Sequence, residues 1–103
     1  MQKVVRDGKV AVLFSPTFGA GWWTFNTEIP ECLFDPEIVE LVERGASFEE
    51  IKWTASQRWP GGYWGGADGL RVQWVKEGES FTLEEHDGSE SFRFRDSEGW
   101  VIA

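Results

Sequence analysis

The chain has 103 residues and a formal net charge of −8, from 18 acidic and 10 basic residues. This length predicts a single domain, residues 1–103. Long DNA or RNA is not expected as a ligand, because clustered Lys and Arg supply most of the affinity for phosphate backbones and no such cluster is present. Seven Trp and eight Phe make the chain unusually aromatic, and we expect only part of this surface to lie in the core.

The N-terminal segment is predicted to form a β-hairpin over residues 3–14. Two β-rich runs flank Asp7-Gly8, a dipeptide typical of a type I′ turn. Residues 10–14 are apolar throughout, which predicts a strand buried on both faces. A loop over residues 15–23 follows from its Pro and Gly content, and residues 23–27 are expected to form a short strand or extended segment.

Two short helices are predicted in the middle of the chain. Asp35-Pro36 supplies an N-cap followed by a proline at the first helical position, and Gly45 ends this helix. Ser47, with Glu50 three residues later, forms the capping-box pattern that starts the second helix. This helix is expected to end near Trp59, before a proline.

Strands dominate the C-terminal part. Residues 70–75, 81–86 and 89–95 are predicted strands, with Asp87-Gly88 as a second type I′ turn, and residues 100–102 are expected to add an edge strand. Segregated strands and helices predict an α+β fold. The expected architecture is one antiparallel sheet of about five strands, an N-terminal hairpin plus a C-terminal meander, with two helices packed on one side.

Two glycine-rich loops carry tryptophans and are the first candidate site. Gly19 and Gly21 follow a buried strand, where backbone N–H groups could approach an anion, although a tight turn explains them equally well. In the second loop, Tyr63 and Trp64 lie between two Gly-Gly pairs. Aromatic rings on such a loop suit a stacking lid. The alternative is that they plug the end of the sheet as core.

The C-terminal hairpin supplies the second candidate. Its two-residue turn places Glu85 opposite Glu90, on the same face as neighbouring Phe and Leu side chains. Opposed like charges are unfavourable, so solvent, an arginine, ligand hydroxyls or a shared proton should compensate. The alternative is two glutamates at a solvated sheet end.

The sequence gives little reason to expect a disulfide, a metal site or a cofactor. His86 is the only histidine and Cys32 the only cysteine, so neither an intramolecular disulfide nor a metal site of ordinary composition is expected, and no cofactor is implied. The N-terminus lacks a signal-peptide pattern, and no apolar run is long enough to span a bilayer. A cytoplasmic location is the default expectation.

Five segments resemble a group of small, uncharacterised phage- and prophage-encoded proteins, and together they extend over nearly the whole chain. These segments are residues 5–13 (VRDGKVAVL), 18–22 (FGAGW), 33–39 (LFDPEIV), 65–70 (GGADGL) and 84–91 (EEHDGSES). The resemblance implies an accessory protein inside a bacterial host, where short acidic proteins often antagonise host defence. It transfers no activity and no site residue.

The leading hypothesis is a non-enzymatic binder of a small nucleotide-like ligand, such as a sponge for a defence second messenger. In this hypothesis Gly19 and Gly21 would bind the phosphate, and Trp22, Tyr63 and Trp64 would stack on the base. Glu85 or Glu90 would accept hydrogen bonds from the ribose hydroxyls. Arg71 would be a charge partner. The central expectation is that the two loops and the glutamate pair converge on one cleft.

Two other hypotheses stay open. An acidic helix face could make the chain an inhibitor of a host defence or nucleic-acid-binding protein, as a DNA mimic or anti-CRISPR protein would be, by docking on its basic surface. The residues of this face would be Glu37, Glu40, Glu43, Glu49 and Glu50. The third hypothesis is a carboxylate-dependent enzyme using Glu85 and Glu90. Exposed aromatic side chains also favour self-association into a homo-oligomer.

Overall fold

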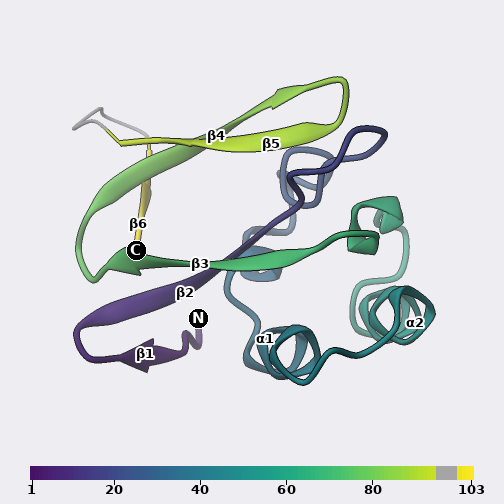
Figure 1. The fold of residues 1–103 in the computed structure, drawn as a ribbon, viewed down its shortest axis with the longest axis horizontal. Coiled ribbons are helices and arrows are strands. Elements are labelled where there is room, and N and C mark those ends of the chain that lie inside the picture. The colour runs from purple at the N-terminus through teal and green to yellow at the C-terminus, as the bar shows by residue number, and fades with distance from the viewer. Residues whose placement is uncertain (95–99) are drawn as a thin grey trace.

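The fold is α+β, as predicted, and is taken from a computed structural model that describes residues 1–94 and 100–103. Figure 1 shows its helices on one side of a sheet and a second sheet on the other. The elements are β1 (Val5–Arg6), β2 (Lys9–Phe14), the 3₁₀ turn η1 (Pro30–Leu33), α1 (Pro36–Glu43), α2 (Phe48–Arg58), the 3₁₀ turn η2 (Gly65–Ala67), β3 (Arg71–Lys76), β4 (Ser80–His86), β5 (Ser89–Arg93) and β6 (Val101–Ile102).

The strands form two antiparallel sheets, ordered β1-β2-β3 and β5-β4-β6. The expected sheet of about five strands is therefore matched only roughly, because the strands of the described residues are divided between two sheets. The cause lies in the connection between β3 and β4. The N–H of Gly78 donates to the carbonyl of Ala103, and the N–H of Ala103 donates to the carbonyl of Glu79, at 2.8 and 3.0 Å. The C-terminal residues thereby take the place beside β4 that β3 was expected to occupy.

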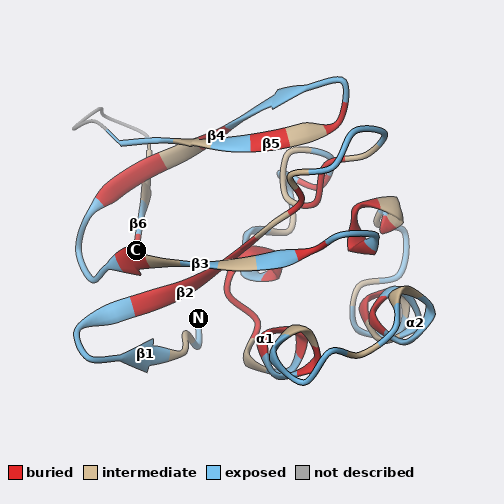
Figure 2. Cartoon of the chain, in the orientation of Figure 1, coloured by how far each residue is buried: buried red, intermediate tan, exposed pale blue. Residues whose placement is uncertain are grey.

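Strand β2 is the centre of the molecule. Its alternate side chains enter two different cores, as its apolar sequence predicts. Ala11 and Leu13 pack in the cluster that contains the buried faces of α1 and α2. Val10 and Val12 pack in the cluster with Phe81 of β4. All of this strand from Val10 to Leu13 is buried (Figure 2), so the molecule has three layers: helices, first sheet, second sheet.

Both helices begin where the sequence predicts. The Asp35 side chain accepts a hydrogen bond from the N–H of Ile38 at 3.1 Å, and the Ser47 hydroxyl accepts one from the N–H of Glu50 at 3.2 Å. Gly45 follows α1 with φ of 74°, the left-handed conformation expected after a helix C-terminus.

Both hairpin turns are also confirmed. At Asp87-Gly88 the φ angles are 50° and 87°, as a type I′ turn requires, and Glu85 pairs with Glu90 in the predicted register. The expectation of an extended segment over residues 23–27 is wrong. The N–H of Asn26 donates to the carbonyl of Trp23 at 2.8 Å, so the chain turns there.

Candidate functional site

The two glycine-rich loops and the β4–β5 hairpin do converge, in a region that we call the loop junction. A Cβ atom on Gly66 of the second loop would lie 2.3 Å from the carbonyl oxygen of Gly21. A Cβ on Gly88, at the hairpin turn, would lie 2.3 Å from the backbone nitrogen of Ala20. The N–H of Gly19 donates to the carbonyl of Asp87 at 2.7 Å. Glycine is therefore used here for backbone-to-backbone packing, which occupies the N–H predicted to receive a phosphate.

Glu90 lies buried inside the loop junction, only 2% exposed. Its carboxylate accepts hydrogen bonds from the N–H of Ser15 at 2.7 Å and from the N–H and hydroxyl of Thr24, both at 2.8 Å. These charge-assisted bonds offset the cost of burying the carboxylate. They provide the compensation for opposed like charges that the sequence required, without a ligand.

Glu85 occupies a different environment although it pairs with Glu90 in register. It is exposed, and its carboxylate accepts a hydrogen bond from the N–H of Gly88 at 2.7 Å. The solvated-end alternative therefore describes Glu85 but not Glu90. The two carboxylates do not form one solvent-facing pair, so this geometry gives the glutamate enzyme hypothesis no support.

Asn26 is a second buried connector, and no sequence pattern predicts its role. Its amide nitrogen donates to the carbonyls of Trp22 and Tyr63 at 2.6 and 2.7 Å, and its side-chain oxygen accepts from the N–H of Tyr63 at 2.7 Å. One side chain thus joins the two glycine-rich loops. An isolated Asn in a loop has no pattern that distinguishes this role from a solvated turn residue.

The tryptophans of the two loops pack in the core. Trp22 and Trp64 are 0% and 3% exposed, and their ring centroids are 4.8 Å apart. Their indole N–H groups donate to the carbonyls of Cys32 and Trp59, at 2.7 and 3.3 Å. This arrangement corresponds to the core-plug alternative for Trp64 and leaves neither ring with a free face for stacking. Tyr63 does lie outside, 54% exposed.

Arg71, the predicted charge partner, begins β3. It pairs with Phe14 in the strand register, and it is exposed. With Trp22, Trp64 and Glu90 buried, the loop junction is a packed connection, and the predicted binding groups do not line an open cleft.

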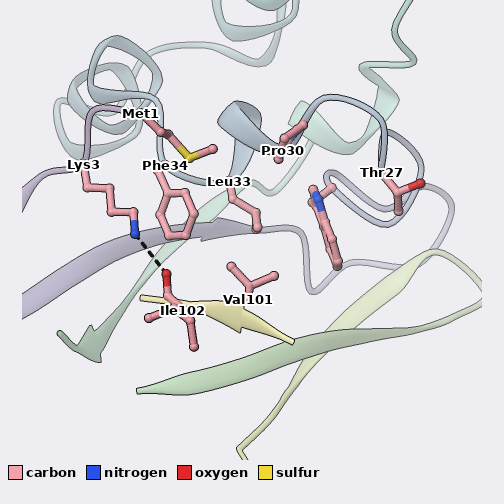
Figure 3. A pocket seen from close by; sticks show the side chains of 9 residues that line it. Met1, Lys3, Thr27, Pro30, Leu33, Phe34, Val101 and Ile102 are labelled. Atoms are coloured by element: carbon pink, nitrogen blue, oxygen red, sulfur yellow. Dashed lines mark hydrogen bonds between the residues drawn. The ribbon is translucent and has the colours of Figure 1, made fainter. Parts of the chain in front are cut away.

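A cavity of about 390 Å³ opens elsewhere, beside η1 and β6 (Figure 3). We call it the Trp23 cavity. Its lining consists of Met1, Lys3, Trp23, Thr27, Pro30, Leu33, Phe34, Val101 and Ile102. The Lys3 ammonium donates to the carbonyl of Ile102 at 2.9 Å and lies 4.6 Å from the ring centroid of Phe34. The other walls are mainly apolar.

Trp23 contributes the most unusual feature of this cavity. Its indole nitrogen, Nε1, is buried, and no hydrogen-bond partner lies within reach among residues 1–94 and 100–103. A buried N–H without a partner costs about 1–3 kcal/mol, so such groups are rare in folded proteins. From the sequence we expect one of the adjacent residues Trp22 and Trp23 to lie in the core and the other to face outward or into a cleft.

A second cavity, of about 400 Å³, lies beside Arg6, Asp7, Lys9, Glu43 and Trp74. The guanidinium of Arg6 in this lining already binds other groups of the chain. The Arg6 guanidinium lies 5.2 Å from the Trp74 ring centroid and donates two hydrogen bonds to Glu43, at 2.7 and 2.9 Å. The hydrogen bonds and the charge of Glu43 raise the pKa of Arg6.

The acidic helix face is partly neutralised by ion pairs. Glu37 pairs with Arg58, Glu43 with Arg6, and Glu50 with Arg44. Glu40 and Glu49 are exposed. Docking of this face on a basic protein stays a prediction, and these pairs reduce the charge it would present.

Comparisons with protein-family models, curated proteins and solved structures give no match for this chain. Within residues 1–94 and 100–103, no three His, Cys, Asp or Glu side chains are grouped so that they could hold a metal ion. In the same part of the chain, no helix has the length and apolar composition that crossing a bilayer requires.

Proposed function

We propose that the protein is a non-catalytic binder of a small molecule, which it holds in the Trp23 cavity. The observation that carries the proposal is that Trp23, which lines this cavity, has a buried indole N–H with no hydrogen-bond partner among residues 1–94 and 100–103. A ligand oxygen or nitrogen that accepted this hydrogen bond would remove the cost of the unpaired donor. The volume of about 390 Å³ falls in the usual range for small-molecule sites, which combine apolar walls with few polar groups.

The lining defines the general chemistry of the ligand. Pro30, Val101 and Ile102 present apolar surface, so most of the ligand should be apolar. It should also carry an acceptor for Trp23. A nucleobase combines a planar ring with ring acceptors, so the nucleotide-like ligand predicted from the sequence remains a member of this class, at a different location. The phage setting and the role as a second-messenger sponge likewise remain predictions.

The proposal is tested by calorimetric titration with neutral and anionic aromatic compounds, nucleosides and cyclic nucleotides. Trp23→Phe removes the N–H and keeps an aromatic ring. We expect it to weaken the best ligand about 2- to 10-fold, the usual effect of one net hydrogen bond. Trp53→Phe is the matched control, because Trp53 is 65% exposed on α2 and does not line the cavity. The proposal is contradicted if no compound of the panel binds, or if the two variants bind the best ligand with equal affinity.

A further inference from the structure

We propose that the ligand of the Trp23 cavity is an apolar monocarboxylate whose carboxylate binds the ammonium of Lys3. This inference rests on the proposed function and specifies its ligand class. Of the nine residues that line the cavity, Lys3 is the one with a charged side chain.

The Lys3 ammonium is held in place and still has capacity to donate. An ammonium has three N–H donors, and one of them goes to the carbonyl of Ile102 at 2.9 Å (Figure 3). Its position over the Phe34 ring, 4.6 Å from the centroid, further fixes it beside the cavity. A charge-assisted bond from an ammonium to a carboxylate is stronger than a bond between neutral groups.

The polar groups of the lining favour an acceptor without donors of its own. The Trp23 indole donates and cannot accept, and the Lys3 ammonium also only donates. An ionised carboxylate is an acceptor only, with two oxygens. An amide or alcohol would bring a donor as well, and the hydroxyl of Thr27 is the one side-chain acceptor in the lining that could receive it.

The charge balance favours one negative charge over several. A single lysine offsets one charge, and the whole chain carries −8, so a diphosphate or triphosphate would meet net repulsion. A cyclic mononucleotide carries one charge, but its ribose and base would place further polar groups against apolar walls, which is unfavourable without partners. Within the wider class of small ligands, these observations therefore favour an apolar monocarboxylate over a nucleotide.

The test compares two probes of nearly equal shape, 2-naphthoate and 2-naphthamide, by calorimetric titration of the full chain at pH 7. We expect the acid to bind at least about 10-fold more tightly than the amide, as for a hydrogen bond to a charged group. Cyclic AMP serves as the nucleotide probe and should bind more weakly than the acid.

Variants at two lysines locate the effect. Lys3→Met should abolish the preference for the acid, whereas Lys3→Arg should keep it. Lys76→Met is the control, because it removes the same charge from the end of β3, outside the cavity lining. Lys3→Arg also keeps the test valid if Lys3→Met fails to fold.

The outcomes separate the two proposals. Equal binding of acid and amide, tighter binding of cyclic AMP, or an equal loss in the Lys3→Met and Lys76→Met variants overturns the carboxylate assignment alone. If neither naphthalene probe binds, and no compound of the wider panel binds either, the proposed function is overturned as well.

Discussion

Glu90 and Ser15 hold each other through two reciprocal hydrogen bonds. The N–H of Ser15 donates to the Glu90 carboxylate at 2.7 Å, and the N–H of Glu90 donates to the Ser15 carbonyl at 2.8 Å. The two residues are 75 positions apart in the sequence. They attach the β4–β5 hairpin to the loop that leaves β2, and thus connect the edge of the second sheet to the first.

Replacing Glu90 should therefore destabilise the fold. In Glu90→Gln, the new amide nitrogen cannot accept a hydrogen bond, so one of the donors from Ser15 or Thr24 loses its partner. We expect the free energy of unfolding in urea to fall by about 1–3 kcal/mol. Glu85→Gln is the control at the exposed cross-strand partner and should cost no more than about 0.5 kcal/mol. Equal losses in the two variants would refute the structural role assigned to Glu90.

The close approach at Gly88 can be separated from its backbone conformation. Gly88 and Gly78 both have φ of 87°, but a Cβ on Gly78 would meet nothing within 4 Å, whereas one on Gly88 would collide with the backbone of Gly19 and Ala20. Gly78→Ala should cost about 1–2 kcal/mol through left-handed strain alone. Gly88→Ala should cost about 1–3 kcal/mol more through overpacking. Thermal unfolding of both variants measures the difference, and a difference near zero would mean that the hairpin does not pack on the loop.

Cys32 should make stability fall at alkaline pH. Burial raises the pKa of its thiol, and the negative charge of Glu90 raises it further. The folded state therefore holds the thiol proton above pH of about 8.5, where an unfolded cysteine releases it. The contribution of Cys32 is complete below that pH and is lost as pH rises, by about 1 kcal/mol near pH 9.5.

Urea unfolding at pH 7 and pH 9.5 measures this loss, with Cys32→Ala as the reference for all other titrating groups. The wild type should lose more stability than the variant over this interval. The native thiol should also react slowly with a disulfide reagent until urea unfolds the chain. Rapid modification of the native thiol would contradict the buried, protonated state.

Local signals in the sequence were sufficient for most individual elements. The Asp-Gly turns, the Asp35 and Ser47 caps and the apolar run of β2 act over a few neighbouring residues, and each is confirmed. The sheet arrangement was not predictable in this way. It depends on hydrogen bonds between Ala103 and the Gly78–Glu79 turn, which are distant in sequence and leave no periodic pattern.

The candidate site, like the fold, was predictable from the sequence only in part. Sequence reasoning correctly brought the glycine-rich loops and the Glu90 hairpin together, but it could not show that Trp22 and Trp64 would fill the space between them. Glycine permits a close approach of backbone and equally a close approach of ligand, so the residue type alone does not distinguish the two. The Trp23 cavity combines residues from both ends of the chain, which no local motif reveals.

The most direct test of the central claim observes the Trp23 indole proton itself. Heteronuclear NMR of the ¹⁵N-labelled chain resolves indole N–H signals for its seven tryptophans, and Trp23→Phe assigns one of them. We predict that 2-naphthoate shifts the Trp23 signal downfield as the N–H gains an acceptor, while the signals of Trp22 and Trp64, whose N–H groups already have partners, stay in place. A Trp23 signal that does not move when the probe is bound at saturation would contradict the account.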